Sequence, residues 1–288
     1  MSSTICRDSD YPVLMPVTVR RDRGILVRTK SPLYASSAND TPTWLAAVSA
    51  LITAMADLSP FIKEALERLF KNLPEAKFEL PRLREKYKKY VSRSALEKVI
   101  LGVHESIASE SDDSFYILAG PKGAGKTTAI THVLDNKNGV LRLDVSEADT
   151  AKSILSKVLF SGDGTVDTGN LGLNILEPGF WAAADAMGGR RVTVVMEVER
   201  GTDSESVLYM VKSAAKKLAC FAKVIVVLSE ANSALMFGDD PRHEFIWVDG
   251  MEPEEATEYA KKEFPAIADN DIELFIDKVG IIAYQYYC

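Results

Sequence analysis

One nine-residue stretch, GPKGAGKTT at 120–128, constrains this 288-residue chain more than any other. Gly120, Gly125, Lys126 and Thr127 fill every fixed position of the pattern G-x-x-x-x-G-K-[ST]. The β-branched and aromatic run FYILA precedes the stretch, and the apolar run TAITHVL follows its start. A strand, a glycine loop and a helix in this order bring backbone N–H groups to a helix N-terminus, where anions are favoured. The stretch therefore predicts a loop that cradles phosphate groups.

Each part of this loop has an expected role. Lys126 is expected to reach the β- and γ-phosphates of a nucleotide, and the Thr127 hydroxyl to bind Mg²⁺. A guanine-reading N-K-x-D element is missing at the expected strand end, which favours ATP; Asn136-Lys137-Asn138-Gly139 is expected to form a turn instead. The predicted nucleotide-binding residues are Gly120, Pro121, Lys122, Gly123, Ala124, Gly125, Lys126, Thr127 and Thr128.

From residue 94 onward, short β-branched runs alternate with helical segments. Five strands joined by helical crossovers imply an α/β fold with a parallel sheet and helices on both faces. The predicted strands are 115–119, 139–144, 192–198, 223–229 and 244–249.

The chain divides into four predicted parts. Residues 1–40 are expected to form an irregular arm with one strand in GILVRT, and 41–89 a helical N-terminal region and basic linker. One helix is expected over 42–57, and a second opens at Ser59-Pro60, a capping residue followed by proline. An ATPase core is expected over 90–250 and a short or truncated helical lid over 251–288.

Charge and cysteine content bear on partners and location. Residues 1–89 carry a net charge of +5 and residues 90–288 a net charge of −12, which suggests two different surfaces. The basic surface could meet nucleic acid, an acidic membrane face or the acidic part of the chain, and a protein partner or a homo-oligomer could use the N-terminal region. The basic segment 82–93 is either a solvated helix face or a nucleic-acid contact. Three widely spaced cysteines favour an intracellular protein. Whether the compartment is cytoplasmic or nuclear stays open. The apolar window 44–56 is too short for a membrane span, which needs about 20 residues.

Residues from about Tyr90 to Gly280 resemble the additional-strand division of P-loop ATPases, in the AAA+ and STAND branch that includes the archaeal-type ATPases. The resemblance rests on YVSRSALEKVI, GPKGAGKTT, TVVMEVER, the polar strand end at Ser229 and FIWVDGMEPEEATEYA, of which GPKGAGKTT is highly specific. Within that branch the chain is most similar to the ATPase module of retrotransposon hot spot and Crinkler-type proteins. The resemblance implies a P-loop NTPase three-layer sandwich with a five-stranded, mainly parallel sheet. In this fold the strand that carries the metal site does not directly follow the loop strand along the chain.

The resemblance also implies roles for the acidic strand end in TVVMEVERG. In the family this strand ends in Asp-Glu, with the Asp holding hydrated Mg²⁺ and the Glu activating the attacking water. If the strand is VTVV, Glu197 takes the catalytic position; if it is one residue longer, Glu197 is the metal-side acid and Val198 replaces the base. Glu199 would project to the same side as Glu197, but about 6.5 to 7 Å further along. The metal candidates are Thr127 and Glu197.

Further candidates come from the same resemblance. Ser229 matches the residue that senses the γ-phosphate, with Asn232 as a fallback, so the catalytic candidates are Glu197, Glu199 and Ser229. Arg242 is either a charge-stabilising finger on a neighbouring subunit or a surface partner of Asp239 or Asp240, and Arg93 resembles an arginine near the base pocket.

Because loss of a positioned general base lowers a rate by about 10² to 10⁴, a slow Mg-ATP hydrolase or a nucleotide-dependent switch is the favoured function. The alternatives are an ATP-binding interaction protein that does not hydrolyse ATP, and a nucleic-acid-associated ATPase switch.

Overall fold

The computed structural model describes Ser49, Ile52 and residues 58–76, 90–107, 113–146, 149–160, 172–199, 204–228, 230–238 and 240–279. All of them belong to one of the two units into which the chain divides, Thr41–Cys288. The predicted arm at 1–40 lies outside the described residues, as do all but the last four residues of the basic segment. Of the predicted helix over 42–57, Ser49 and Ile52 are described, and both are helical.

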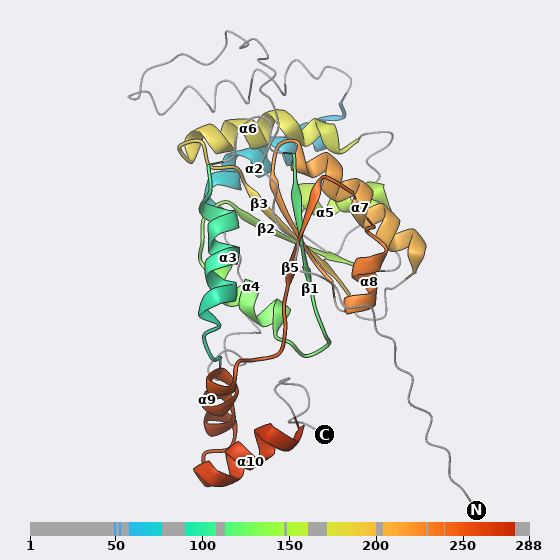
Figure 1. The fold of residues 1–288 in the computed structure, drawn as a ribbon. Coiled ribbons are helices and arrows are strands. Elements are labelled where there is room, and N and C mark those ends of the chain that lie inside the picture. Colours follow the sequence, from blue (N-terminus) through green and yellow to red (C-terminus); the bar gives the residue numbers. More distant parts are fainter. Residues whose placement is uncertain are drawn as a thin grey trace, which may run out of the picture. The chain divides into compact units, whose positions relative to one another are not determined.

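Five parallel strands form one sheet in the order β2-β3-β4-β1-β5 (Figure 1). The predicted strand bounds are right to within two residues at each end. In the sheet β4 lies between β1 and β3, and the predicted fold class is confirmed. The strands are β1 (Phe115–Ala119), β2 (Val140–Val145), β3 (Thr193–Val198), β4 (Lys223–Val227) and β5 (His243–Trp247).

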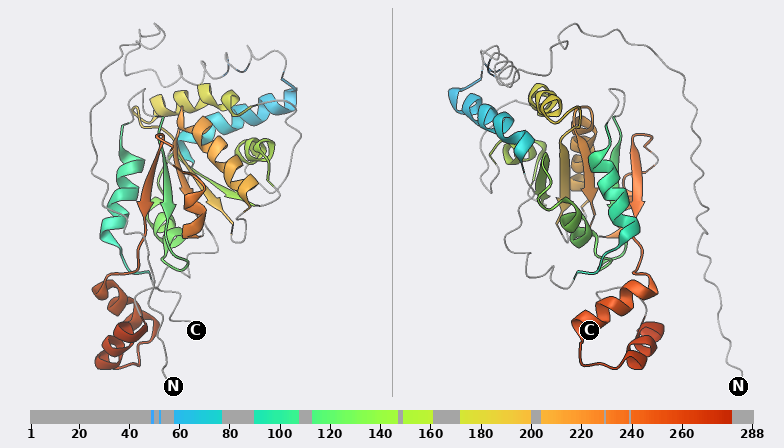
Figure 2. Two further views of the ribbon diagram at one scale, coloured as in Figure 1. Left: turned by 45° about the vertical axis from the view of Figure 1, so that its right-hand side comes forward. Right: turned by 90° about the vertical axis from the view of Figure 1, so that its left-hand side faces the viewer.

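Helices cover both faces of this sheet, as the two views of Figure 2 show. Among the described residues, no helix is long and apolar enough to cross a membrane. The helices are α2 (Pro60–Asn72), α3 (Ser94–Glu105), α4 (Lys126–Leu134), α5 (Ala151–Phe160), α6 (Glu177–Ala186), α7 (Glu205–Ala219), α8 (Ala231–Leu235), α9 (Pro253–Glu263) and α10 (Asp269–Val279), with 3-10 turns η1 (Leu73–Glu75) and η3 (Leu173–Leu176).

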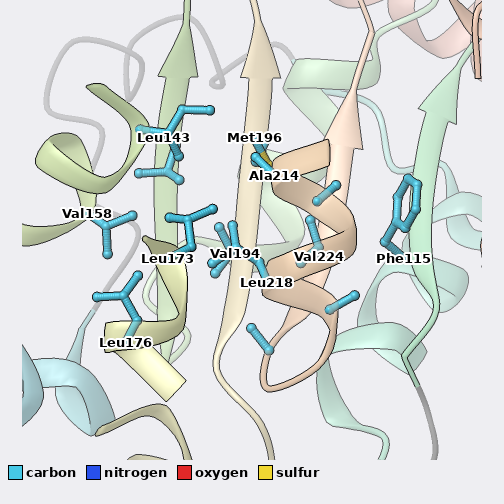
Figure 3. Close-up of a cluster of buried hydrophobic side chains, with 14 of the residues drawn as sticks. Phe115, Leu143, Val158, Leu173, Leu176, Val194, Met196, Ala214, Leu218 and Val224 are labelled. Carbon is cyan, nitrogen blue, oxygen red and sulfur yellow. The ribbon is translucent and has the colours of Figure 1, made fainter. Parts of the chain in front are cut away.

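The alternation of side chains along β3 divides the core into two layers. Val194 and Met196 pack into a large cluster with α2, α5, α6 and α7, and Figure 3 shows Val194 beside Leu218 and Met196 beside Ala214 of α7. Val195 points the other way, into a smaller cluster beneath α3 and α4. Because successive strand residues face opposite sides, Glu197 lies on the same side of the sheet as Val195, toward α4.

The helix that the Ser59-Pro60 signal predicts is present as α2. Ser59 caps it, since its side chain accepts a hydrogen bond from the Ile62 N–H, and Pro60 is the first helical residue. Phe70 on the buried face is packed so closely against Gly179 of α6 that a side chain at position 179 would meet its ring at 2.1 Å. Helix α2 thus packs into the same large hydrophobic cluster as the strands of the sheet. The domain boundaries stay a prediction.

Candidate functional site

The glycine-rich loop connects the carboxyl end of β1 to the first turn of α4. Gly120 needs to be glycine because a Cβ there would lie 2.1 Å from the carbonyl oxygen of Val248. Gly125 is the N-cap of α4 and has a left-handed φ of 81°, which glycine adopts at little cost. The strand-loop-helix context that the sequence predicted is confirmed. The predicted turn is also present, with left-handed φ values of 60° at Asn136 and 75° at Gly139.

Lys126 is folded into the loop that precedes it. Its Nζ donates hydrogen bonds to the carbonyl oxygens of Gly120 at 2.8 Å and Pro121 at 2.9 Å, and only 6% of the residue is exposed. A buried ammonium group needs such partners, since its burial is costly otherwise. The loop therefore holds a positive charge beside the backbone amides at the start of α4, an arrangement suited to an anion.

Thr127 links this loop to the acidic strand end. Its Oγ1 donates a hydrogen bond of 2.6 Å to Oε1 of Glu197, which joins the first turn of α4 to β3. A hydroxyl and a carboxylate oxygen side by side are ligands that Mg²⁺ accepts together with phosphate oxygens. Of the two sequence alignments, this contact favours the one in which Glu197 is the metal-side acid. The next residue, Val198, is 3% exposed and packs in the opposite cluster.

The other predicted catalytic residues are less well defined. Glu199 follows the last residue of β3; it is exposed, and its backbone N–H donates to the carbonyl of Val145. Ser229 lies outside the described residues, and Asn232 is in α8. The roles of Glu199 and Ser229 stay predictions.

The site also includes two residues of β2, Arg142 and Asp144, which the sequence did not indicate. The Nη2 of Arg142 donates to Oε2 of Glu197 at 2.5 Å, so Glu197 is held from both sides, by Thr127 and by Arg142. The Nε of Arg142 lies 2.8 Å from Oδ1 of Asp144, an ion pair whose N–H geometry is not that of a hydrogen bond. The available signal was the alternation in VLRLDV, which puts both polar side chains on one face of the strand.

Arg93, predicted to lie near a base pocket, connects the loop to α9. Its Nη1 donates to the carbonyl of Ala124 at 2.8 Å and its Nη2 to the carbonyl of Gly250 at 2.7 Å. Its Nε pairs with Oε2 of Glu255 at 3.3 Å, and that same oxygen accepts the N–H of Glu252 in the capping box of α9. One guanidinium thus fixes the glycine-rich loop, the chain after β5 and the first turn of α9.

Tyr90 supports Arg93 from the same segment. Its hydroxyl donates to Glu97 at 2.7 Å, and its ring lies 4.2 Å from the ring of His132 on α4. Burial, followed by the hydrogen bond to Glu97, raises the pKa of Tyr90 well above its usual value, so the hydroxyl stays a donor. Lys262 of α9 donates to the carbonyl of Tyr90 at 3.0 Å. Residues 90–93 are therefore fixed to both α4 and α9.

The remaining candidates lie apart from this site. Arg242 Nη1 lies 3.8 Å from Asp113, a pairing the sequence did not suggest, while the Arg242 backbone N–H donates to Asp240. Within the part of the chain that the structure describes, no group of three or more His, Cys, Asp or Glu side chains could hold a metal by itself. A cation at Thr127 and Glu197 would take further ligands from phosphate oxygens and water.

Comparisons with solved structures find similarity only at a low level. The chain is similar to a Signal Transduction ATPase with Numerous Domains (STAND) protein with a tetratricopeptide repeat sensor from Pyrococcus horikoshii, at 14% identity and a TM-score of 0.41, over 73% of this chain and 30% of that one. It is also similar to Drosophila ORC bound to DNA, at 14% identity and a TM-score of 0.39, over 91% of this chain and 62% of that one. The chain thus spans less than two thirds of either protein. No family model and no curated protein matches it.

Proposed function

We propose that this chain binds Mg-ATP through residues 120–128 and acts as a slow ATPase or a nucleotide-dependent switch. The observation that carries the proposal is the hydrogen bond between Thr127 and Glu197. It brings a hydroxyl at the end of the glycine-rich loop to a carboxylate at the carboxyl edge of a parallel sheet. Ligands of open α/β sheets bind at this edge. The proposal includes the closer resemblance to the ATPase module of retrotransposon hot spot and Crinkler-type proteins that the sequence suggests.

Each residue of the site has a chemical task in the proposed complex. The loop amides bind phosphate oxygens, and Lys126 exchanges its bonds to the Gly120 and Pro121 carbonyls for bonds to the β- and γ-phosphates. Thr127 and Glu197 would hold Mg²⁺, which supplies charge neutralisation to the phosphates when bound. ATP is proposed over GTP because the sequence lacks a guanine-reading element at the expected strand end.

Slow turnover is proposed because β3 supplies one acid where fast ATPases have two. Glu197 accepts a hydrogen bond from the Thr127 hydroxyl, and the next residue of β3 is the buried Val198. A missing general base lowers a rate by about 10² to 10⁴ while binding through the loop persists. The chain can therefore report nucleotide occupancy without rapid turnover.

Binding and turnover are tested separately, by calorimetric titration with ATP and by phosphate release. Lys126→Ala is expected to weaken ATP binding about 10- to 100-fold, because hydrogen bonds from a charged donor are lost. Lys217→Ala is the matched control, since this exposed lysine lies on α7, on the opposite face of the sheet. Undiminished ATP binding by Lys126→Ala would reject the proposed nucleotide site.

Glu197→Gln distinguishes the slow ATPase from the switch. Phosphate release by the wild type that disappears in this variant identifies an ATPase. Binding of ATP by both proteins without release above background identifies a switch.

A further inference from the structure

The strand register puts a second carboxylate directly beside Glu197. Asp144 of β2 and Glu197 of β3 are partners in the parallel pairing, as are Arg142 and Val195 two residues earlier. Paired residues of neighbouring strands point to the same face, and the strands lie about 4.8 Å apart. Glu199 is two residues further along the chain, about 6.5 to 7 Å away. Asp144 is therefore better positioned than Glu199 to act with Glu197.

Arg142 holds these two carboxylates together. Its guanidinium contacts Oε2 of Glu197 and Oδ1 of Asp144, and only a fifth of its side chain is exposed. Two carboxylates side by side repel each other unless a cation lies close to both. The Arg142 guanidinium takes the place of that cation in this structure.

The exposure of the two acids fits a shared cation better than a purely structural ion pair. Glu197 is mostly buried and already bound to Thr127, whereas the side chain of Asp144 is 55% exposed. A solvent-facing carboxylate can accept hydrogen bonds from the water shell that Mg²⁺ usually keeps. Arg142 and Mg²⁺ would then compete for the same pair of acids.

We propose that Asp144 of β2, paired with Glu197 across the strand register, is the second carboxylate of the metal site, and that Arg142 neutralises the pair until the metal–nucleotide complex binds. This inference rests on the proposed function of the loop. It places the second carboxylate of the metal site on the neighbouring strand rather than at Glu199, and the general base stays missing. It also makes Arg142 a positioning residue that lowers the affinity for the metal.

The test measures metal affinity rather than turnover. Mn²⁺ is titrated into the full chain saturated with a non-hydrolysable ATP analogue, and free Mn²⁺ is followed by electron paramagnetic resonance. Analogue binding is first measured in EDTA, where Lys126 and the loop act without metal. Asp144→Asn is expected to weaken Mn²⁺ binding about 10- to 100-fold, the usual effect of losing a group that supports a metal site. Glu199→Gln is the matched neutralisation of the rival acid and is expected to change Mn²⁺ affinity less than twofold.

Arg142→Gln gives an effect of the opposite sign, which misfolding cannot produce. It is expected to tighten Mn²⁺ binding about tenfold, because no charged donor then competes for Glu197. Unchanged Mn²⁺ affinity in Asp144→Asn, or weakening in Glu199→Gln alone, would overturn the proposal, as would weakening in Arg142→Gln. Failure of the wild type to bind the analogue even in EDTA would reject the nucleotide site and this inference together.

Discussion

His104 is a buried histidine whose surroundings disfavour its charged form. Its Nδ1 lies 2.9 Å from Oγ1 of Thr193, and 1% of the residue is exposed. Burial, and then the positive charges of Arg190, Lys223 and Lys137, lower the pKa of His104 from 6.5 to about 4. The folded protein therefore keeps this imidazole neutral at a pH where the unfolded chain would protonate it.

The resulting pH dependence has a defined sign. Between pH 6.5 and 4 the unfolded state binds one more proton than the folded state at this site, so stability falls as the pH falls through that window. Above pH 6.5 both states are neutral and the loss vanishes. The free energy of unfolding of the wild type, relative to His104→Gln, is expected to drop by about 2 kcal/mol between pH 7 and pH 5. Urea unfolding of both proteins at pH 7 and pH 5 measures this drop. The same difference in free energy of unfolding between wild type and His104→Gln at both pH values would contradict the lowered pKa.

Arg93 is expected to stabilise the whole of α9, because it joins this helix to the glycine-rich loop. Removing its hydrogen bonds to Ala124 and Gly250 and its pairing with Glu255 is expected to let α9 open more often. Hydrogen bonds of a charged donor contribute about 1.5 to 3 kcal/mol, so amide exchange in residues 253–263 should accelerate about 10- to 100-fold in Arg93→Ala. Exchange measured by mass spectrometry on the intact chain tests this expectation.

Two comparisons sharpen that experiment. Arg93→Lys keeps the charge but lacks the planar fork, so it should restore only part of the protection. Arg68→Ala, at an exposed position of α2, should leave exchange in α9 unchanged. Protection of α9 that survives in Arg93→Ala would show that other contacts hold the helix.

Strands and helices were predictable here because their periodicity is local. The runs that became β1 to β5 are β-branched and bounded by turn residues, and Ser59-Pro60 marked the start of α2. The loop was predictable because the pattern G-x-x-x-x-G-K-[ST] specifies residue types at fixed positions of the sequence. Arg142 and Asp144 were not, because their role depends on which residues of β2 and β3 are partners, and sequence alone does not give that register. Arg93 was noted by resemblance, but its contacts with Ala124, Gly250 and Glu255 join distant parts of the chain.

The described part of the chain folds around a sheet whose core extends beyond the predicted ATPase core at 90–250. Leu66, Leu69 and Phe70 of α2 belong to the same buried cluster as the strands of the sheet. The charge difference between residues 1–89 and 90–288 therefore does not divide the hydrophobic core. It follows that α2 should unfold together with the glycine-rich loop rather than before it, as expected for a cooperative unit.

Phe70→Ala tests this shared core. Phe70 is fully buried, and truncating such a ring costs about 3 to 5 kcal/mol. Because the lost contacts reach Gly179 on α6, the expected result is a single unfolding transition at lower urea, with ATP binding lost in the same transition. Phe61→Ala on the same helix is the matched control, since Phe61 is 53% exposed and its truncation should cost less than about 1 kcal/mol. Two separate transitions in Phe70→Ala, with ATP binding retained after the first, would mean that α2 is an independent layer on the nucleotide site.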